Sequence, residues 1–193
     1  MLAEKLKNRN LILGSASPRR QQFIKDLGLN FEVRLKSVEE NFPNTLKGEE
    51  IADFLAELKA KAFLKELNPE DILITGDTIV WQDKEVLHKP KNEKQAYDML
   101  KKLSGNAHQV ISAACIMTTT QKFIVHDITK VYFKDLADEE ILYYIENFNP
   151  YDKAGGYGIQ EWIGKIGIDK IEGSFYNVMG MPIGKVYDVL KEI

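Results

Sequence analysis

The chain of 193 residues is long enough for one large α/β domain or two small lobes around a cleft, and we expect a single domain over residues 1–193. Hydrophobic residues make up 44% and charged residues 28%, a balance typical of a globular rather than a disordered protein. The formal net charge of −3 argues against a broad basic face for nucleic acid and favours a small ligand held by local cations. Neither a signal sequence nor a membrane span of about 20 apolar residues is present, so we expect a cytoplasmic protein without membrane contact.

A single cysteine and three histidines give little support for thiol or zinc chemistry. Cys115 lies in the apolar run 110–117 and cannot form an intrachain disulfide, so we interpret it as a buried structural thiol. His88, His108 and His126 lack the spacing of zinc ligands. We interpret His108 as a loop or core histidine rather than a catalytic base.

Residues 12–20 predict a strand end, a turn and a helix start that together bind an anion. Pro18 suits the first helical position and Ser17 is a good N-cap, so free backbone N–H groups should face the mouth of the preceding strand. Phosphate fits such a turn, and the side chains expected beside it are Ser15, Ser17, Arg19 and Arg20. The alternative is an ordinary capped helix with surface arginines.

The first part of the chain predicts alternating strands and helices. The expected elements are a strand at 11–13, a helix at 18–27, a strand at 31–35, a helix at about 48–66 and a strand at 72–75. Glu39 and Glu40 follow the second of these strands and are expected at its end. Residues 76–78 interrupt the next buried run before a β pattern resumes at 79–81, which places Asp77 at another strand end.

The rest of the chain predicts hairpins and further helices around a mixed sheet. The expected elements are a turn at 82–85, a helix from 91 or 92 to 103, an antiparallel hairpin of 110–117 and 122–133, a helix at 138–147, loops at 152–160 and 173–182, and a last helix that includes 186–193. Glycines in the loop at 152–160 would permit close approach of the backbone to a ligand.

The carboxylates predicted at strand ends would suit metal-assisted chemistry on a polyphosphate. Carboxylate oxygens of Glu39, Glu40 and Asp77 are ligands that Mg²⁺ or Mn²⁺ prefers, and one carboxylate could orient or deprotonate water. The cations available to neutralise phosphate oxygens are Arg19, Arg20, Lys59 and Lys89. The alternatives are that Asp77 only caps a turn and that Lys59 and Glu39 are solvated surface charges.

Five segments spread over nearly the whole chain resemble, in order and spacing, the successive motifs of the Maf nucleotide pyrophosphatases. They are residues 15–20, 76–80, 88–90, 103–105 with His108, and 152–160. The resemblance implies an elongated α/β fold related to the inosine-triphosphate pyrophosphatases, with a mixed twisted sheet, helices and a cleft between two lobes. It also implies a possible homodimer.

By the same resemblance, the activity is hydrolysis of a nucleoside triphosphate to the monophosphate and pyrophosphate, with a divalent metal cofactor. Asp77 matches the proposed proton acceptor. The positions matched with metal and phosphate are Glu40, Lys59 and Lys89, with Glu40 and Asp77 expected on the metal, and those matched with substrate choice are Arg19, Thr78 and Gln160. The form of residues 157–160 resembles the branch that acts on dTTP and UTP. One departure from the family is Phe-Asn-Pro at 148–150, where relatives often carry Gly-Glu-Pro.

Gln160 offers both an amide donor and an acceptor to the O4/N3 edge that uracil and thymine share. Cytosine reverses that edge, so a pocket built around Gln160 should disfavour CTP. Because an amide can flip, we expect a fixed backbone group of the same loop to supply the direction.

Other functions remain open at this level. The chain could be a pyrophosphatase for modified nucleotides. The resemblance also implies a second alternative, a nucleotide-binding regulator of septum formation with little turnover, because the Maf family is linked with arrest of septum formation. A phosphatase with Asp77 as covalent nucleophile is less well supported, because Thr78 and Ile79 stand where a second aspartate would be expected.

Overall fold

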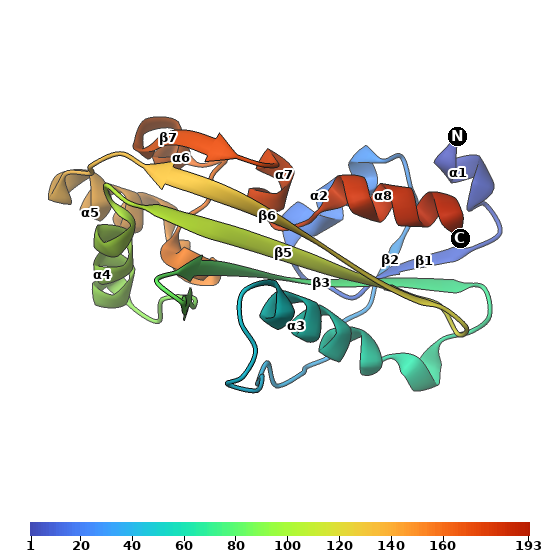
Figure 1. Cartoon of the computed structure of the whole chain (residues 1–193). Coiled ribbons are helices and arrows are strands. Elements are labelled where there is room, and N and C mark those ends of the chain that lie inside the picture. The colour runs from blue at the N-terminus through green and yellow to red at the C-terminus, as the bar shows by residue number, and fades with distance from the viewer. The chain divides into compact units, whose positions relative to one another are not determined.

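A computed structural model describes residues 1–193, which form a mixed α/β fold around a seven-stranded sheet (Figure 1). The strands are β1 (Asn10–Leu13), β2 (Glu32–Val33), β3 (Asp71–Gln82), β4 (Glu85–Leu87), β5 (Ala107–Met117), β6 (Lys122–Phe133) and β7 (Ile168–Glu172). Their order is β2-β1-β3-β5-β6-β7, and β4 pairs with β3 beside this path. Since β1 runs parallel to β2 and β3 while β4 and β7 run antiparallel to β3 and β6, the predicted mixed sheet is confirmed.

Eight α-helices and three short 3-10 helices accompany the sheet. The α-helices are α1 (Leu2–Lys5), α2 (Pro18–Asp26), α3 (Glu49–Lys61), α4 (Glu93–Leu103), α5 (Asp138–Phe148), α6 (Trp162–Gly167), α7 (Phe175–Met179) and α8 (Ile183–Glu192). The 3-10 helices are η1 (Leu64–Glu66), η2 (Pro150–Asp152) and η3 (Ala154–Gly156). None of these helices combines the length and the apolar character needed to cross a bilayer.

The chain divides into two compact units. The first comprises residues 1–77, 112–127 and 180–193, and the second comprises residues 78–111 and 128–179. Strands β3, β5 and β6 supply residues to both units, because each is 11 or 12 residues long. The border on β3 falls between Asp77 and Thr78.

Buried strands and flanking helices form the core of the first unit. β1 pairs with β3 so that Ile12 lies opposite Leu73. Both of these side chains are fully buried. Helix α3 covers one face of this part of the sheet, while α2 and α8 cover the other (Figure 1). Each helix buries apolar side chains at helical spacing, among them Ile24, Ile51 and Val186.

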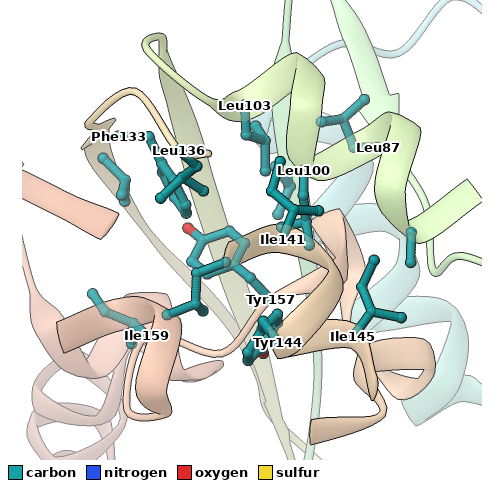
Figure 2. Packing of buried hydrophobic residues seen from close by; sticks show 14 of the residues in the cluster. Leu87, Leu100, Leu103, Phe133, Leu136, Ile141, Tyr144, Ile145, Tyr157 and Ile159 are labelled. Atoms are coloured by element: carbon teal, nitrogen blue, oxygen red, sulfur yellow. The ribbon is translucent and has the colours of Figure 1, made fainter. Parts of the chain in front are cut away.

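Apolar side chains from α4, α5, β6 and the segment after η3 form the core of the second unit, which Figure 2 shows from close by. Leu100 and Leu103 of α4 pack with Ile141 and Tyr144 of α5, and all four are fully buried. Tyr157 joins the same cluster. The segment that carries Gln160 therefore begins inside a hydrophobic core.

Three expectations about the strands need correction. β3 is one continuous strand of 12 residues, so Asp77 lies in its middle rather than at a strand end. Glycine accepts the extended backbone at position 76, and the Asp77 carboxylate has a partner within the fold, so the strand has no reason to stop there. β2 covers only Glu32–Val33, which leaves Glu39 and Glu40 in a loop well beyond its end.

Two helical regions also differ from the expectation. The long helix predicted to residue 66 ends at Lys61, and residues 64–66 form the separate turn η1. The stretch from 162 to 179 contains α6, β7 and α7, whereas the sequence analysis assigned no element to residues 161–172 and a loop to 173–182. These elements are only five or six residues long, too short to show a clear hydrophobic period.

Candidate active site

Three predicted site residues meet in the first unit. Nζ of Lys59 on α3 lies 2.5 Å from Oδ1 of Asp77 on β3 and 2.9 Å from Oε1 of Glu40 in the loop after β2. The Asp77 and Lys59 side chains are 11% and 18% exposed, whereas that of Glu40 is 51% exposed. The cluster of Glu40, Lys59 and Asp77 is thus buried on the strand side and open on the loop side, as a site for a charged ligand must be.

The position of this cluster follows from how α3 is fastened to β3. The buried Thr75 hydroxyl donates a hydrogen bond to the carbonyl of Ala56, at 2.7 Å. Lys59 lies three residues after Ala56 on the same side of the helix, and Asp77 lies two residues after Thr75 on the same side of the strand. One buried contact therefore sets the helix and strand so that the ammonium group and the carboxylate meet.

The predicted anion turn is built mostly from its own hydrogen bonds. Ser17 caps α2 as expected, because its Oγ accepts from the backbone N–H of Arg20 at 3.5 Å. Oγ of Ser15 accepts from the N–H of Ser17 and from Nη1 of Arg20, each at 3.3 Å. Arg19, next to them, is partly exposed. The two serines thus shape the turn, and Ser15 is nearly buried in it.

Arg20 fastens this turn to the sheet. Its Nη1 donates to the carbonyl of Gly76 at 2.8 Å, and its Nε donates to the carbonyl of Gly180 at 2.9 Å. Burial lowers the pKa of the Arg20 guanidinium, and the nearby Asp77 carboxylate opposes that shift. The side chain therefore holds the backbone beside Asp77, in addition to the phosphate role expected from the sequence.

Gly76 is required where Arg20 meets β3. A Cβ at this position would lie 2.7 Å from the carbonyl oxygen of Ala113 and 3.6 Å from Nε of Arg20. The first distance is too short for any carbon, and the contact is with backbone that cannot easily move. The glycine next to Asp77 thus marks a close approach of neighbouring backbone.

The acidic residues of the cluster suit a hard divalent cation. Glu40 and Asp77 offer carboxylate oxygens around one point, which the Lys59 ammonium group contacts. No group of three or more histidine, cysteine, aspartate or glutamate side chains suited to a metal occurs. Mg²⁺ typically takes only one or two protein carboxylates and completes its shell with phosphate oxygens and water, so this donor set fits a metal that arrives with a nucleotide.

The remaining predicted residues, Thr78, Lys89 and Gln160, belong to the second unit. Thr78 is partly exposed on β3, and Lys89 is exposed just after β4. The N–H of Gly155 donates to the carbonyl of His88 at 3.3 Å, so the glycine turn of η3 lies beside the residue that precedes Lys89.

Gln160 lies on a segment held at both ends. Before it, the buried Tyr157 hydroxyl lies 2.7 Å from Nε2 of His108, and burial lowers the pKa of His108 to about 4. His108 is therefore a core histidine, as the sequence predicted. Gln160 itself is half-buried and lines a cavity of about 460 Å³, together with parts of α6, β7 and Phe175.

After Gln160, the segment is held by residues that the sequence reasoning missed. The Tyr144 hydroxyl donates to Oε2 of Glu161 and accepts the N–H of Gly158 at 3.0 Å, while Nζ of Lys153 lies 3.2 Å from Oε1 of Glu161. The one available signal was the place of Tyr144 three residues after the inward Ile141, which puts a polar aromatic group in the core.

Comparison with known proteins gives a consistent result. The family model described as "Maf-like protein" matches residues 10–193. A protein from Flavobacterium johnsoniae named "dTTP/UTP pyrophosphatase" is 58% identical over 98% of both chains. Proteins of the same name from Flavobacterium psychrophilum and Christiangramia forsetii are 54% and 49% identical, over 97% and 100% of this chain and 96% and 98% of their own lengths.

The solved structures that resemble this chain include two distant relatives in sequence. The Ham1 protein of Staphylococcus aureus is 16% identical, with a TM-score of 0.49 over 67% of this chain and 73% of its own. A nucleoside-triphosphatase, titled dITP/XTP pyrophosphatase, from Mycobacterium abscessus is 15% identical, with a TM-score of 0.44 over 66% of this chain and 76% of its own.

Proposed function

This chain belongs to the Maf family, and from that membership we propose that it hydrolyses nucleoside triphosphates, dTTP and UTP foremost, to the monophosphate and pyrophosphate. The observation that carries the proposal is the cluster of Asp77, Lys59 and Glu40, which joins a poorly exposed carboxylate to a cation and a second carboxylate. The names of the relatives, dTTP/UTP pyrophosphatase at up to 58% identity, support the substrates.

In this reaction Asp77 accepts the proton of the attacking water. The water oxygen forms a bond to the α-phosphorus, the bond from the α-phosphorus to the bridging oxygen breaks, and pyrophosphate leaves. Lys59 holds the Asp77 carboxylate in place, and the strand around it is rigid because Arg20 fastens Gly76. Arg19 and Lys89, as cations, neutralise phosphate oxygens, with Ser15 and Ser17 at the turn.

A divalent cation is part of the proposal. Glu40 and Asp77 would hold Mg²⁺ or Mn²⁺, which when bound neutralises phosphate charge and favours departure of pyrophosphate. Gln160 selects the base, with Arg19 and Thr78 contributing to the choice of substrate. The cytoplasmic location and the homodimer stay predictions of the sequence.

The test is a panel of UTP, dTTP, CTP and GTP, assayed for pyrophosphate with Mg²⁺, Mn²⁺ or Co²⁺. We expect UTP and dTTP to be cleaved with stoichiometric release of pyrophosphate, and activity to vanish on chelation of the metal. Release of orthophosphate alone would overturn the reaction proposed. Tight nucleotide binding without turnover in any metal would instead favour the regulatory alternative.

A further inference from the structure

Glu161 is unusual among the acidic residues of the second unit because most of its side chain is buried. It is 19% exposed, and both carboxylate oxygens are engaged: Oε1 lies 3.2 Å from the Lys153 ammonium group and Oε2 accepts from the Tyr144 hydroxyl. Lys153 is itself 8% exposed. Lys153 also pairs with Asp152 at 2.7 Å, so a change of the Glu161 rotamer would leave only the buried Tyr144 hydroxyl without its acceptor.

Tyr144 connects this carboxylate to the backbone of the neighbouring loop. Its ring is fully buried in the core of Figure 2, and its hydroxyl accepts the N–H of Gly158 while it donates to Glu161. Burial and the Glu161 contact both raise the pKa of Tyr144, so the hydroxyl keeps its proton. The distance between Gly158 and the Glu161 carboxylate is thereby set by one rigid aromatic side chain.

The amide of Gln160 lies against the same glycine. A Cβ built on Gly158 would be 3.1 Å from Oε2 of Glu161 and 3.2 Å from Nε2 of Gln160. Nε2 of Gln160 and the carboxylate oxygen that Tyr144 holds thus lie beside the same glycine. A carboxylate attracts the NH₂ end of an amide and repels its carbonyl, so the two orientations of Gln160 differ in energy.

This asymmetry has a consequence for base selection. With its amino end on the side of Gly158 and Glu161, Gln160 leaves its carbonyl as the acceptor for a ligand on the other side. Uracil and thymine carry a donor at N3, whereas cytosine carries an acceptor there. An acceptor facing an acceptor leaves both groups unpaired, which is the basis of strong discrimination in buried sites.

We propose that Glu161, fixed by Tyr144 and Lys153, sets the direction of the Gln160 amide and thereby makes the enzyme prefer uracil and thymine nucleotides to cytosine nucleotides. This rests on the proposed function, and within it Glu161 and Tyr144 are positioning residues that do not touch the reacting phosphate. The sequence-based expectation assigned that direction to a backbone group of the loop, and this proposal assigns it to a side-chain carboxylate instead.

The decisive variant is Glu161→Gln, which keeps the shape and one acceptor but removes the charge. We expect the ratio of kcat/KM for UTP over CTP to fall about tenfold, as one mispaired hydrogen bond would predict. The fall should include an absolute rise in kcat/KM for CTP, because the Gln160 amide becomes free to turn. General damage to the fold would lower kcat/KM for both UTP and CTP, and so it cannot produce that rise.

A second variant and a matched control keep the test independent of folding. Tyr144→Phe removes only the hydroxyl that holds Glu161 and Gly158, and it should lower the same ratio. Tyr143→Phe makes the same chemical change at the next residue of α5, where the side chain is 48% exposed, and should leave the ratio unchanged.

The outcomes separate this inference from the proposed function. A UTP/CTP ratio within twofold of wild type in folded Glu161→Gln overturns the inference, and if that variant fails to fold, Tyr144→Phe decides by the same criterion. Failure of the wild type to release pyrophosphate from UTP and dTTP overturns the proposed function instead.

Discussion

The two units hold their functional groups by different physical means. In the first, the Lys59 ammonium group meets two carboxylates that lie 18 and 19 positions away in the sequence, and the Glu40 end of the cluster is open to solvent. In the second, the buried hydroxyls of Tyr144 and Tyr157 hold the segment around Gln160. In the proposed function, the first arrangement provides charge for the reaction and the second provides a fixed shape for recognition of the base. Substitutions in the charged cluster should therefore change rates, whereas those around the buried hydroxyls should change stability and selectivity.

The largest effect is expected for Asp77→Asn. The amide keeps the shape of the side chain but cannot accept the proton of water, so kcat should fall about 10²–10⁴-fold in the pyrophosphate assay. Glu40 remains as a partner for Lys59, so the variant should stay folded by circular dichroism. Glu57→Gln is the matched control, because it makes the same change from carboxylate to amide at a residue of α3 whose salt bridges, with Lys61 and Lys122, lie outside the cluster. Near-normal kcat in folded Asp77→Asn would remove Asp77 from the mechanism.

Gly76→Ala tests whether the first unit contains a position where rate and stability are linked. The added Cβ would meet the Ala113 carbonyl at 2.7 Å, so backbone must shift and the free energy of unfolding should fall by about 1–3 kcal/mol. Because Arg20 and Asp77 adjoin this glycine, kcat should fall as well.

The control for that variant is Gly184→Ala in α8, where a Cβ meets nothing within 4 Å. Alanine there should be neutral or should stabilise the protein by up to about 1 kcal/mol, since glycine is a poor helix former. Urea unfolding of both variants gives the comparison. Equal stabilities would mean that the contact at Ala113 relaxes without cost.

Features with a local sequence signal were predicted well. Ser17 and Pro18 mark the start of α2, Asn92 caps α4 with a bond of 2.9 Å to the N–H of Gln95, and the turn after residue 82 has positive φ at Asp83 and Lys84. In each case the backbone geometry depends on residues within a few positions of one another.

Features that depend on distant partners were not predicted. The strand continues through Asp77 because Lys59 and Arg20, far away in sequence, satisfy the polar groups there. The apolar alternation at 31–35 predicted a strand of five residues, yet β2 covers only Glu32–Val33 and Val33 is 38% exposed. Burial of a side chain is decided by what packs on it, and the local pattern does not contain that information.

The residues of the site also fall into those that the sequence predicted and those that it did not. The motif resemblance supplied Glu40, Lys59 and Asp77, and the structure brings these three together. The supporting residues Tyr144 and Glu161 have no motif of their own, because they act only through contacts made in the folded state. The motifs therefore reveal the residues of the proposed site more readily than the residues that hold the neighbouring segments.

His108 makes the buried arrangement of the second unit sensitive to acid. Its pKa is about 4 in the folded chain and near 6.5 when unfolded, so between these values only the unfolded chain binds the proton. Stability is therefore retained above pH 6.5 and lost as the pH falls toward 4, by about 2 kcal/mol at pH 5 from this residue alone. Urea unfolding of wild type and His108→Gln at pH 7.5 and pH 5 measures this loss of stability. Identical losses in both proteins would contradict the assignment.

The smallest effects are expected from substitutions of two helix caps, one in each unit. Asn92 accepts from Gln95 at 2.9 Å and Ser17 accepts from Arg20 at the longer distance of 3.5 Å. Asn92→Ala should cost about 1 kcal/mol of stability, and Ser17→Ala should cost about half of that, because the longer bond is weaker.

The effects of these two variants on KM should rank in the opposite order to their effects on stability. Ser17 stands at the proposed phosphate turn, so Ser17→Ala should raise KM for UTP a few-fold although it destabilises the fold less, whereas Asn92→Ala should leave KM unchanged. Ser17→Thr keeps the hydroxyl and should restore KM, which separates the loss of a donor from a general loosening of α2. If Ser17→Ala leaves KM unchanged, Ser17 acts only as the helix cap that its bond to Arg20 already shows, and phosphate is held by the cations instead.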